Sequence, residues 1–475
     1  MQATRKWGRG MDMTKGALFP SIVKFILPLI VTNLLHQFYN AADIMVVGLS
    51  PEADAVGAVG SAGSYLSLIT NVFIGFSVGA NVAVARHIGA GDREKTAHAV
   101  HTAICMSLLF GALGAVVGIA ACRAVLLGMG YTGNLLTLAV RYSYIYLGCM
   151  PFLALTNFLS AILQAQGNTK TPMLVLTLSG LLNTGLNMFF VLALHLSVEG
   201  VAIATAIANL ASACALWYYL AKRGDVCRVS FRRLRVNREQ FALIARIGFP
   251  AGIQNALFSI SNILIQSSVL QVNNALTPPG SAYAPVIKGS TATGSLENFI
   301  FTALGAVTVT ASAFTAQNMG AGNYRRVRRA FGLICLVSTV IALVMSAVGM
   351  LLREPLLSLY GVKQAEDTLA VITYDAAMVR MFWKWPAFFI YSIMNACAGT
   401  IRGLGKSGLA ALVTFFGTCV FRVVWIYTAF RYFQNLESIF ISYPISWLLT
   451  GAVFLVLLMC LLKRRIQDSD TSVSV

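Results

Sequence analysis

The chain has 475 residues, of which 57% are hydrophobic and 11% are charged, and its mean hydropathy is +0.74. Soluble globular proteins usually carry about 25% charged residues, so the composition excludes a soluble fold and predicts a membrane protein with many spans. The net charge of +18 does not indicate nucleic-acid binding, because the basic residues are confined to alternate short loops. The nine cysteines form no CxxC pair, so we expect neither a disulfide framework nor a zinc site.

Long apolar segments follow one another along the chain, and about 20 such residues cross the hydrocarbon of a bilayer. We predict an all-α polytopic protein with twelve transmembrane helices, at 18–49, 56–85, 97–121, 135–162, 172–194, 198–221, 242–272, 290–316, 327–351, 375–400, 408–430 and 439–462. The first helix is long enough to be tilted or bent, and Pro28 inside it removes one backbone hydrogen bond. No signal-peptide cleavage pattern precedes this helix, so we expect it to be uncleaved.

Lysine and arginine are distributed unevenly between the loops. One set of alternate loops, taken with both termini, holds 24 of these residues, and the other set holds five. Because basic residues are retained on the cytoplasmic side of a membrane, we predict that both termini are cytoplasmic.

The sequence also repeats itself at the ends of matching spans. The stretch "ARHIGAGDREKTAHA" (85–99) recurs as "AQNMGAGNYRRVRRA" (316–330), and "ILQAQGNTKTP" (162–172) is answered by "TIRGLGKSG" (400–408). Two repeats of six spans share one orientation, so a pseudo-two-fold axis along the membrane normal relates them, as in transporters with a substrate site between the halves. The predicted parts are an N-terminal six-helix lobe (1–221), a basic cytoplasmic linker (222–240), a C-terminal six-helix lobe (241–463) and a cytoplasmic tail (464–475).

Further motifs occur in a fixed order along the chain. They are "LP" and "FYNAADIMVVG" in the first span, the "GAG" turn after the second, "QAQGNTKTP", "TIRGLGKS", "FRVVWIY" and "SYPISW". With these motifs the chain resembles the bacterial multidrug and toxic compound extrusion (MATE) transporters over essentially its whole length. The resemblance implies an antiporter of the bacterial plasma (inner) membrane that exports amphiphilic, cationic organic compounds or drugs by alternating access. Its driving ion is then H⁺ or Na⁺, its partners are small-molecule substrates and the lipid bilayer, and we expect a monomer.

The chain has no GxxxxGK[ST] motif and no cluster of catalytic residues, so we expect no ATPase, no other enzymatic activity and no cofactor. His98 and His101 are three residues apart without a third ligand nearby, so we expect no metal site there.

Asp43 is a carboxylate inside the first span, where charge is costly and acids are usually functional. Counting along the spans places Asn187 and Thr205 at the depth of Asp43, with Asn183 one turn deeper. In one MATE branch an acid, an asparagine, a second acid and a threonine at matching places form the cation-coupling site. Asn187 replaces that second acid, and one carboxylate is a poor cage for Na⁺, so we favour H⁺ and leave Na⁺ open. The alternative for the two asparagines and the threonine is hydrogen bonding between helices.

Three polar residues precede Asp43 on the same helix face, and we expect them to support it: His36, Tyr39 and Asn40. Pro28 lies two turns before His36. By resemblance to the family, protonation of Asp43 is expected to bend the first span at Pro28 and to narrow the cavity of the lobe.

The C-terminal half offers Ile265 at the place that matches Asp43, so it is not a second copy of this site. Glu297, in the outer part of the eighth span, either attracts cationic substrate or faces water. Arg422, in the middle of the eleventh span, needs a carbonyl or acidic partner and is predicted to serve gating or structure.

Substrate contact is predicted for aromatic and amide residues of the spans between which the lobes face each other, together with Glu297. They are Tyr65, Phe73, Phe76, Gln254, Phe258, Gln266 and Phe299. Two alternatives stay open: a lipid-linked saccharide flippase of the same superfamily, and a dedicated metabolite exporter. Flippases of this kind carry cationic residues in the central cavity, so a lone arginine in the spans, Arg422, and the acidic Asp43 both argue against the first alternative.

Overall fold

The structure is a computed structural model that describes residues 10–49, 52, 54–277, 284–364 and 366–473. The described residues are mainly helical and form no strand, so the predicted all-α class is confirmed. Residues 1–9 of the predicted N-terminal lobe and residues 474–475 of the predicted tail lie outside the described residues.

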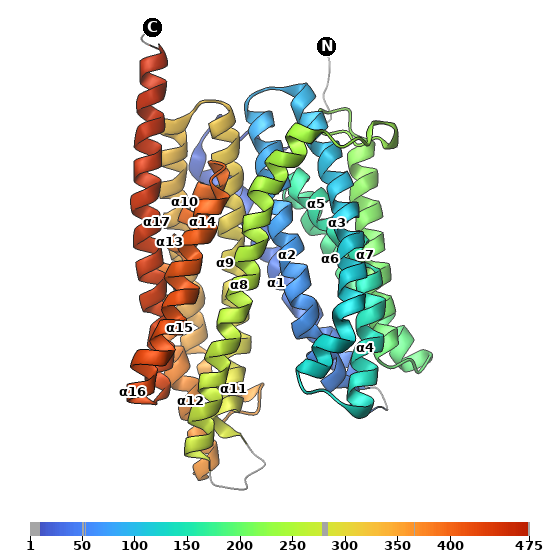
Figure 1. Cartoon of the computed structure of the whole chain (residues 1–475), viewed down its shortest axis with the longest axis vertical. Helices are drawn as coiled ribbons and strands as arrows, with labels where there is room; N and C mark the ends of the chain where they lie inside the picture. The colour runs from blue at the N-terminus through green and yellow to red at the C-terminus, as the bar shows by residue number, and fades with distance from the viewer. Residues whose placement is uncertain (1–9, 50–51, 53, 278–283, 365, 474–475) are drawn as a thin grey trace. The chain divides into compact units, whose positions relative to one another are not determined.

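The helices form two compact units (Figure 1). The first consists of Met1–Ala256 and Ala313–Asn323, and the second consists of Leu257–Ser312 and Tyr324–Val475. The division falls inside two long helices, α8 (Arg238–Leu276) and α9 (Pro285–Gly320), which each contribute to both units. The lobe boundaries predicted at residues 221 and 241 stay a prediction.

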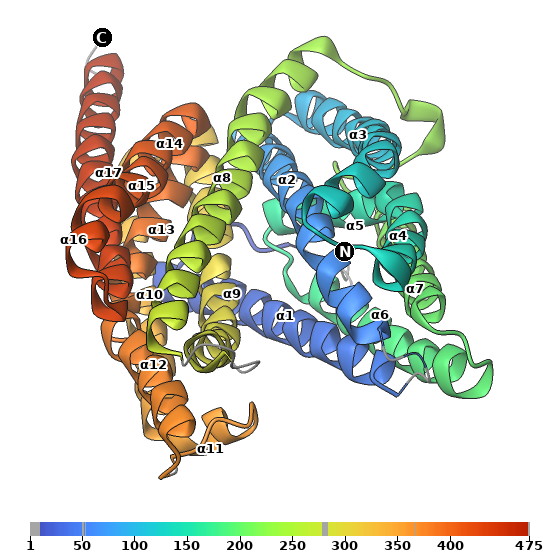
Figure 2. The same ribbon diagram turned by 60° about the horizontal axis from the view of Figure 1, so that its bottom comes forward.

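The first unit contains seven further α-helices and a π-helical segment, η1. They are α1 (Leu18–Val47), α2 (Ala55–Gly89), α3 (Arg93–Gly128), α4 (Gly133–Gly148), α5 (Met150–Ala165), α6 (Lys170–Met188), η1 (Phe189–Ala193) and α7 (Val198–Ala221). Helices α2 and α3 both pack against α5, while α6 packs against α1 on one side and α7 on the other. Figure 2 shows α1 running beside α6. Small buried residues such as Ala80, Ala83, Ala99 and Ala103 let the backbones approach closely.

A short 3₁₀ helix, η2 (Phe231–Arg233), lies in the linker after α7, and the remaining helices belong to the second unit. They are α10 (Tyr324–Leu351), α11 (Arg353–Ser358), α12 (Thr368–Lys384), α13 (Phe388–Gly403), α14 (Ser407–Thr414), η3 (Phe415–Val420), α15 (Phe421–Trp425), η4 (Ile426–Phe430), α16 (Arg431–Phe433) and α17 (Leu436–Val473). The long helix α17, red in Figure 1, packs against both α12 and α13. Aromatic rings fill this contact, and Trp447 of α17 stacks on Phe388 of α13 with ring centroids 5.6 Å apart.

Ten of the described helices are long and apolar enough to cross a membrane, and α4 with α5, bent by 48° at their junction, would make an eleventh. The sequence predicts one continuous helix over 375–400, and this prediction is wrong. The segment is divided between two helices, α12 with 17 residues and α13 with 16 residues. Pro386 lies in the break, and Pro151 lies just after the junction of α4 and α5. Both interruptions follow from the missing N–H and the ring of proline, which disfavour helix at the preceding residues.

The repeated "GAG" motifs close one helix crossing within the first unit. A Cβ atom on Gly89 would collide with the backbone oxygen of Gln317, and a Cβ atom on Gly320 would collide with that of Arg86. Each copy of the motif therefore supplies one of the glycines that let α2 and α9 touch. The second glycine of each copy, Gly91 or Gly322, has a positive φ of 71° or 73°, which ends the helix without steric strain.

Candidate functional site

The predicted coupling residues come from three neighbouring helices of the first unit. Asp43 lies on α1, four residues before the helix ends. Asn183 and Asn187 are one turn apart on α6, and Thr205 lies on α7. Because α6 packs against both α1 and α7, its two amides lie between the carboxylate and the threonine.

The four side chains form one hydrogen-bonded group. The Asn187 amide nitrogen donates to Asp43 Oδ1 at 2.5 Å. The Asn183 amide is assigned with its nitrogen towards Asp43, because only this orientation of its nitrogen and oxygen satisfies both atoms. It then donates to the same oxygen at 2.8 Å and accepts from the backbone nitrogen and Oγ1 of Thr205, both at 3.2 Å. Two amide donors thus converge on one carboxylate oxygen.

The burial of this group matters for its chemistry. Asn183 and Asn187 are fully buried, whereas Asp43 and Thr205 are half-buried. Burial disfavours a charged carboxylate, while donated hydrogen bonds favour it, so the two effects oppose each other. The Asn187 side-chain oxygen is buried and accepts no hydrogen bond from the part of the chain that the structure describes.

A small cavity of about 80 Å³ opens beside this group and is also lined by the three predicted supporting residues, His36, Tyr39 and Asn40. The Tyr39 hydroxyl donates to the Thr177 carbonyl at 3.1 Å, which ties α1 to α6. The Asn40 amide nitrogen lies 3.5 Å from His36 Nδ1. The cavity therefore has polar groups along one face of α1.

Sequence reasoning missed three polar residues of the same cavity: Ser179, Asn209 and Ser212. Ser212 Oγ donates to Ser179 Oγ at 2.6 Å, and the Asn209 amide donates to the Thr205 carbonyl at 2.9 Å. Helical spacing could have found two of them, because Ser179 precedes Asn183 by four residues and Asn209 follows Thr205 by four.

The helices around the site contain two irregular features. Pro28 is buried inside α1, and the Thr32 hydroxyl donates to its carbonyl at 2.7 Å. The π-helical segment η1 begins two residues after Asn187. Segments of π-helix are frequent at functional sites, so this irregularity marks the same region. The predicted bending at Pro28 stays a prediction.

Comparison with known proteins decides the family. The MatE family model matches residues 28–189 and 285–428 of this chain. The chain belongs to the MatE family. The chain is also similar to the probable multidrug resistance protein YoeA of Bacillus subtilis, with 25% identity over 442 residues, 91% of this chain and 92% of YoeA. With the multidrug export protein MepA of Staphylococcus aureus it shares 24% identity over 260 residues, 55% of this chain and 58% of MepA.

The fold agrees with solved structures of the family. An outward-facing MATE family transporter of the MOP superfamily matches with a TM-score of 0.86 and 21% identity, over 98% of this chain and 100% of that one. The predicted resemblance to MATE transporters is therefore confirmed for the family and the fold.

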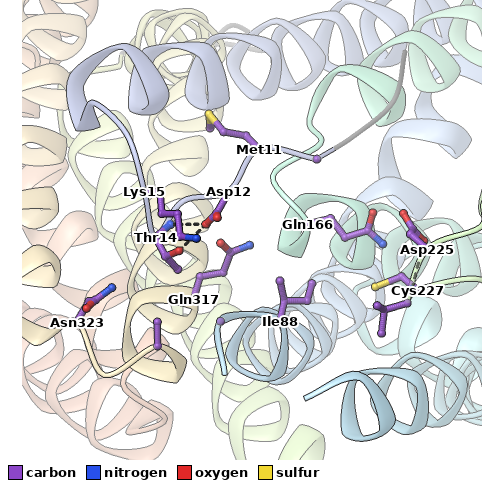
Figure 3. Close-up of a pocket in the computed structure, with 14 residues that line it drawn as sticks. Met11, Asp12, Thr14, Lys15, Ile88, Gln166, Asp225, Cys227, Gln317 and Asn323 are labelled. Carbon is purple, nitrogen blue, oxygen red and sulfur yellow. Dashed lines mark hydrogen bonds between the residues drawn. The ribbon is translucent and has the colours of Figure 1, made fainter. Parts of the chain in front are cut away.

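In this MatE protein a cavity of about 560 Å³ lies in the first unit (Figure 3), and Asp43 is not among its lining residues. It is lined by the segment before α1, the ends of α2, α5 and α9, and the linker between α7 and α8. Met13 is fully buried there, where its N–H donates to Gln317 Oε1 at 3.1 Å and its carbonyl accepts from the Asn318 amide at 3.1 Å. None of the predicted site residues lines this cavity.

The predicted substrate residues of the MatE chain are dispersed. Tyr65, Phe73 and Phe76 are buried in the apolar core of the first unit, and the Tyr65 hydroxyl donates to the Gly118 carbonyl at 2.6 Å. Gln254 is buried, Phe258 and Phe299 are half-buried, and Gln266 is exposed. Contact of these seven residues with substrate stays a prediction.

Glu297 does not face water, which corrects one of the two roles open to it from the sequence. It is 1% exposed and accepts from Arg380 through both carboxylate oxygens, Oε1 from Nε at 3.1 Å and Oε2 from Nη2 at 2.7 Å. Lys384, one turn further along α12, also pairs with Oε2. Glu297 is thus the counter-ion of two cations within the second unit.

Arg422 of α15 lies close to the same cluster. Its Nε donates to Ser446 Oγ at 3.2 Å, and its guanidinium lies 4.0 Å from the centre of the Tyr443 ring. Lys384 Nζ lies 3.9 Å from the centre of that ring. The described partners of Arg422 are a hydroxyl and a ring, not the predicted acid or carbonyl.

Arg422 is also not the lone cation of the spans, because Arg380 and Lys384 accompany it. Sequence reasoning passed over this pair, although two cations one turn apart inside the predicted span 375–400 require a buried acid.

Proposed function

We propose that this MatE protein is a secondary active antiporter that exports amphiphilic, cationic organic compounds from the cytoplasm in exchange for H⁺, which Asp43 carries. The observation that carries the proposal is the convergence of the Asn183 and Asn187 amides on the Asp43 carboxylate beside a polar cavity. Membership of the family, and relatives described as multidrug resistance and multidrug export proteins, support organic compounds as the substrates.

The group can accommodate either protonation state of Asp43. As a carboxylate, Asp43 accepts from the two amides. Once protonated, Asp43 also has an O–H to donate. The Asn187 side-chain oxygen is a nearby acceptor, because it belongs to the same amide as the nitrogen that contacts Asp43. This oxygen is buried and accepts no hydrogen bond from the described residues. Protonation therefore rearranges the contact between α1 and α6, and Pro28 gives α1 a place to bend in response.

One titrating acid is energetically sufficient. Moving one charge inward is worth about 2.3 kcal/mol per 100 mV of membrane potential. At about 1.4 kcal/mol per decade this supports roughly a 40-fold gradient of a neutral substrate. Exchange of one H⁺ for one monovalent cation moves no net charge, so the pH gradient then supplies the drive, about a tenfold substrate gradient per pH unit.

Dye efflux tests the role of Asp43. Cells that express the wild type should lose ethidium faster than cells that express Asp43→Asn, because the amide cannot titrate. Asp54→Asn, which changes an exposed acid of the same unit, is the matched control and should transport normally. Wild-type efflux by Asp43→Asn would overturn the proposal.

A second measurement tests the ion. In proteoliposomes without Na⁺, a pH gradient imposed so that H⁺ flows inward should drive substrate efflux by the wild type. Efflux that requires a Na⁺ gradient and ignores the pH gradient would contradict H⁺ coupling, and would assign the Asp43 group to Na⁺.

One observation favours a second candidate, a lipid-linked saccharide flippase. The cluster of Arg380, Lys384 and Arg422 gives the second unit three buried cations, of which Arg380 and Lys384 pair with the Glu297 carboxylate, and cations can hold pyrophosphate. Translocation of a fluorescent pyrophosphate-linked lipid, with no ethidium efflux from the same vesicles, would support this candidate over drug export.

We further propose a monomer in the bacterial plasma membrane with both termini cytoplasmic, and the lobes 1–221 and 241–463 joined by the linker 222–240. Labelling of single cysteines placed in alternate loops, from either side of intact cells, tests the orientation.

A further inference from the structure

A basic cavity of about 680 Å³ lies where the linker between α7 and α8 folds over the start of α3. Its lining includes four arginines, of which Arg93 comes from α3 and Arg232, Arg233 and Arg235 come from the linker. His98 and His101 line it as well, and Glu94 is the acidic residue among the lining side chains. The four arginines are exposed, so their guanidinium groups are open to solvent.

The linker is anchored on both sides of these arginines. Before them, the Ser230 N–H donates to His101 Nε2 at 3.3 Å. After them, the Asn237 N–H donates to Thr102 Oγ1 at 3.0 Å. His101 is buried, and its Nδ1 lies 2.7 Å from the Ala97 carbonyl, so both of its ring nitrogens serve this anchoring. The histidine that the sequence singles out is therefore structural, and it holds the arginines at the cavity.

The charge of the cavity fits a phosphate group. Four arginines and one glutamate line the cavity, which leaves an excess of positive charge among the lining side chains. Arginine presents a planar set of donors that matches two phosphate oxygens at once.

Apolar side chains beside the cavity indicate that the phosphate belongs to a lipid. Val236, which lines the cavity, is 58% exposed, and Phe231, which directly precedes Arg232 in the chain, is 74% exposed. The Phe231 ring lies 4.4 Å from the ring of Trp217, near the end of α7, and tryptophan is typical of the membrane–water interface. The cavity thus lies beside the start of α3 and the end of α7, and apolar side chains lie next to its arginines. An amphiphile needs both kinds of contact.

We propose that this cavity binds the phosphate of an anionic phospholipid headgroup, with acyl chains against Phe231, and that the bound lipid holds the linker against α3. Basic residues next to spans attract anionic lipids in this way. The proposal does not depend on the coupling ion or on the exported compound.

The test measures lipid binding by the full-length protein in detergent, by native mass spectrometry and by thermal unfolding. Phosphatidylglycerol should bind and stabilise the wild type more than phosphatidylcholine does. In Arg232→Gln/Arg233→Gln the affinity for phosphatidylglycerol should fall about 30-fold. Each of the two arginines contributes a factor of about 5 to the affinity for anionic lipid, and the two factors multiply. Arg232→Lys/Arg233→Lys keeps the charges and should retain part of the preference.

Matched controls separate the cavity from charge in general. Arg328→Gln/Arg329→Gln removes two exposed arginines of α10 and should leave the preference unchanged. Inorganic phosphate and glycerol 3-phosphate should not reproduce the stabilisation, since they lack acyl chains.

Three results would overturn the proposal: equal binding of the two lipids by the wild type, equal loss in both glutamine variants, or full stabilisation by free phosphate. If the double variant does not fold, Phe231→Ser answers the question instead, because it leaves every arginine in place. Phe231→Ser should weaken phosphatidylglycerol binding. Unchanged binding would overturn the proposed contact between the acyl chains and Phe231, and therefore the proposal that the ligand is a lipid.

Discussion

Replacing Glu297 by glutamine should destabilise the second unit strongly. The change keeps the shape of the side chain but removes the only carboxylate that the structure shows in contact with Arg380 and Lys384. All three side chains are at least nine-tenths buried, so water cannot replace the lost counter-ion.

The magnitude follows from the geometry. At the 2.7 Å that separate Arg380 Nη2 from Glu297 Oε2, one pair of unit charges interacts by about 6 kcal/mol at an effective dielectric constant of ~20. Part of that attraction only offsets the cost of burying the charges, and removing one partner of a buried pair typically costs about 3–5 kcal/mol. Because both Arg380 and Lys384 lose their carboxylate partner, we expect a loss of stability in the upper part of this range.

A matched pair of variants measures the effect. Glu297→Gln should unfold at clearly lower temperature and denaturant concentration than the wild type. Glu199→Gln breaks the more exposed ion pair with Arg141 and should cost only about 0–1 kcal/mol of stability. In that pair the Arg141 side chain is 62% exposed and the Glu199 side chain is 28% exposed.

The double variant Glu297→Gln/Lys384→Met removes one surplus cation and should recover part of the lost stability. Equal stability of Glu297→Gln and Glu199→Gln would refute the reasoning, because it would mean that the cluster is solvated.

Three further predictions concern the helix crossing, the bend and the linker. Gly320→Val should destabilise the protein in thermal unfolding, since its Cβ would collide with the Arg86 oxygen, whereas Gly332→Ala, with open space around the glycine, should be tolerated. Pro28→Ala should slow dye efflux while leaving expression normal, and wild-type efflux would contradict bending at this residue. Burial raises the pKa of the Cys227 thiol to about 12, so this linker cysteine should resist maleimide at neutral pH until urea loosens the linker, and rapid labelling of the native protein would count against the structure there.

The candidate coupling group shows how far sequence reasoning reaches. Asp43, Asn183, Asn187 and Thr205 could be matched because helices have a constant rise, so counting residues along a span measures depth. The same counting cannot tell which face of one helix meets which face of another. The contribution of Ser212 to this cavity therefore follows only from the packing of α7 against α6, where its hydroxyl meets Ser179.

The buried ion cluster shows the opposite case. The sequence offers Glu297 and Arg422 only as separate charges, because the partners of each lie on other helices. Charge pairing across helices depends on which helices are neighbours, and neither composition nor periodicity contains that information.

By itself the sequence determined the helical, membrane-spanning class, and it predicted the duplication and the level of Asp43 along the first span. These properties are local or additive: apolar length decides whether a helix can span, repeated glycines mark equivalent turns, and rise per residue sets depth. Only the tertiary structure decided that two amides converge on Asp43, that Glu297 neutralises cations instead of facing water, and that the linker arginines gather over α3. Those arrangements depend on side chains from different helices meeting within a few ångströms, which packing alone brings about.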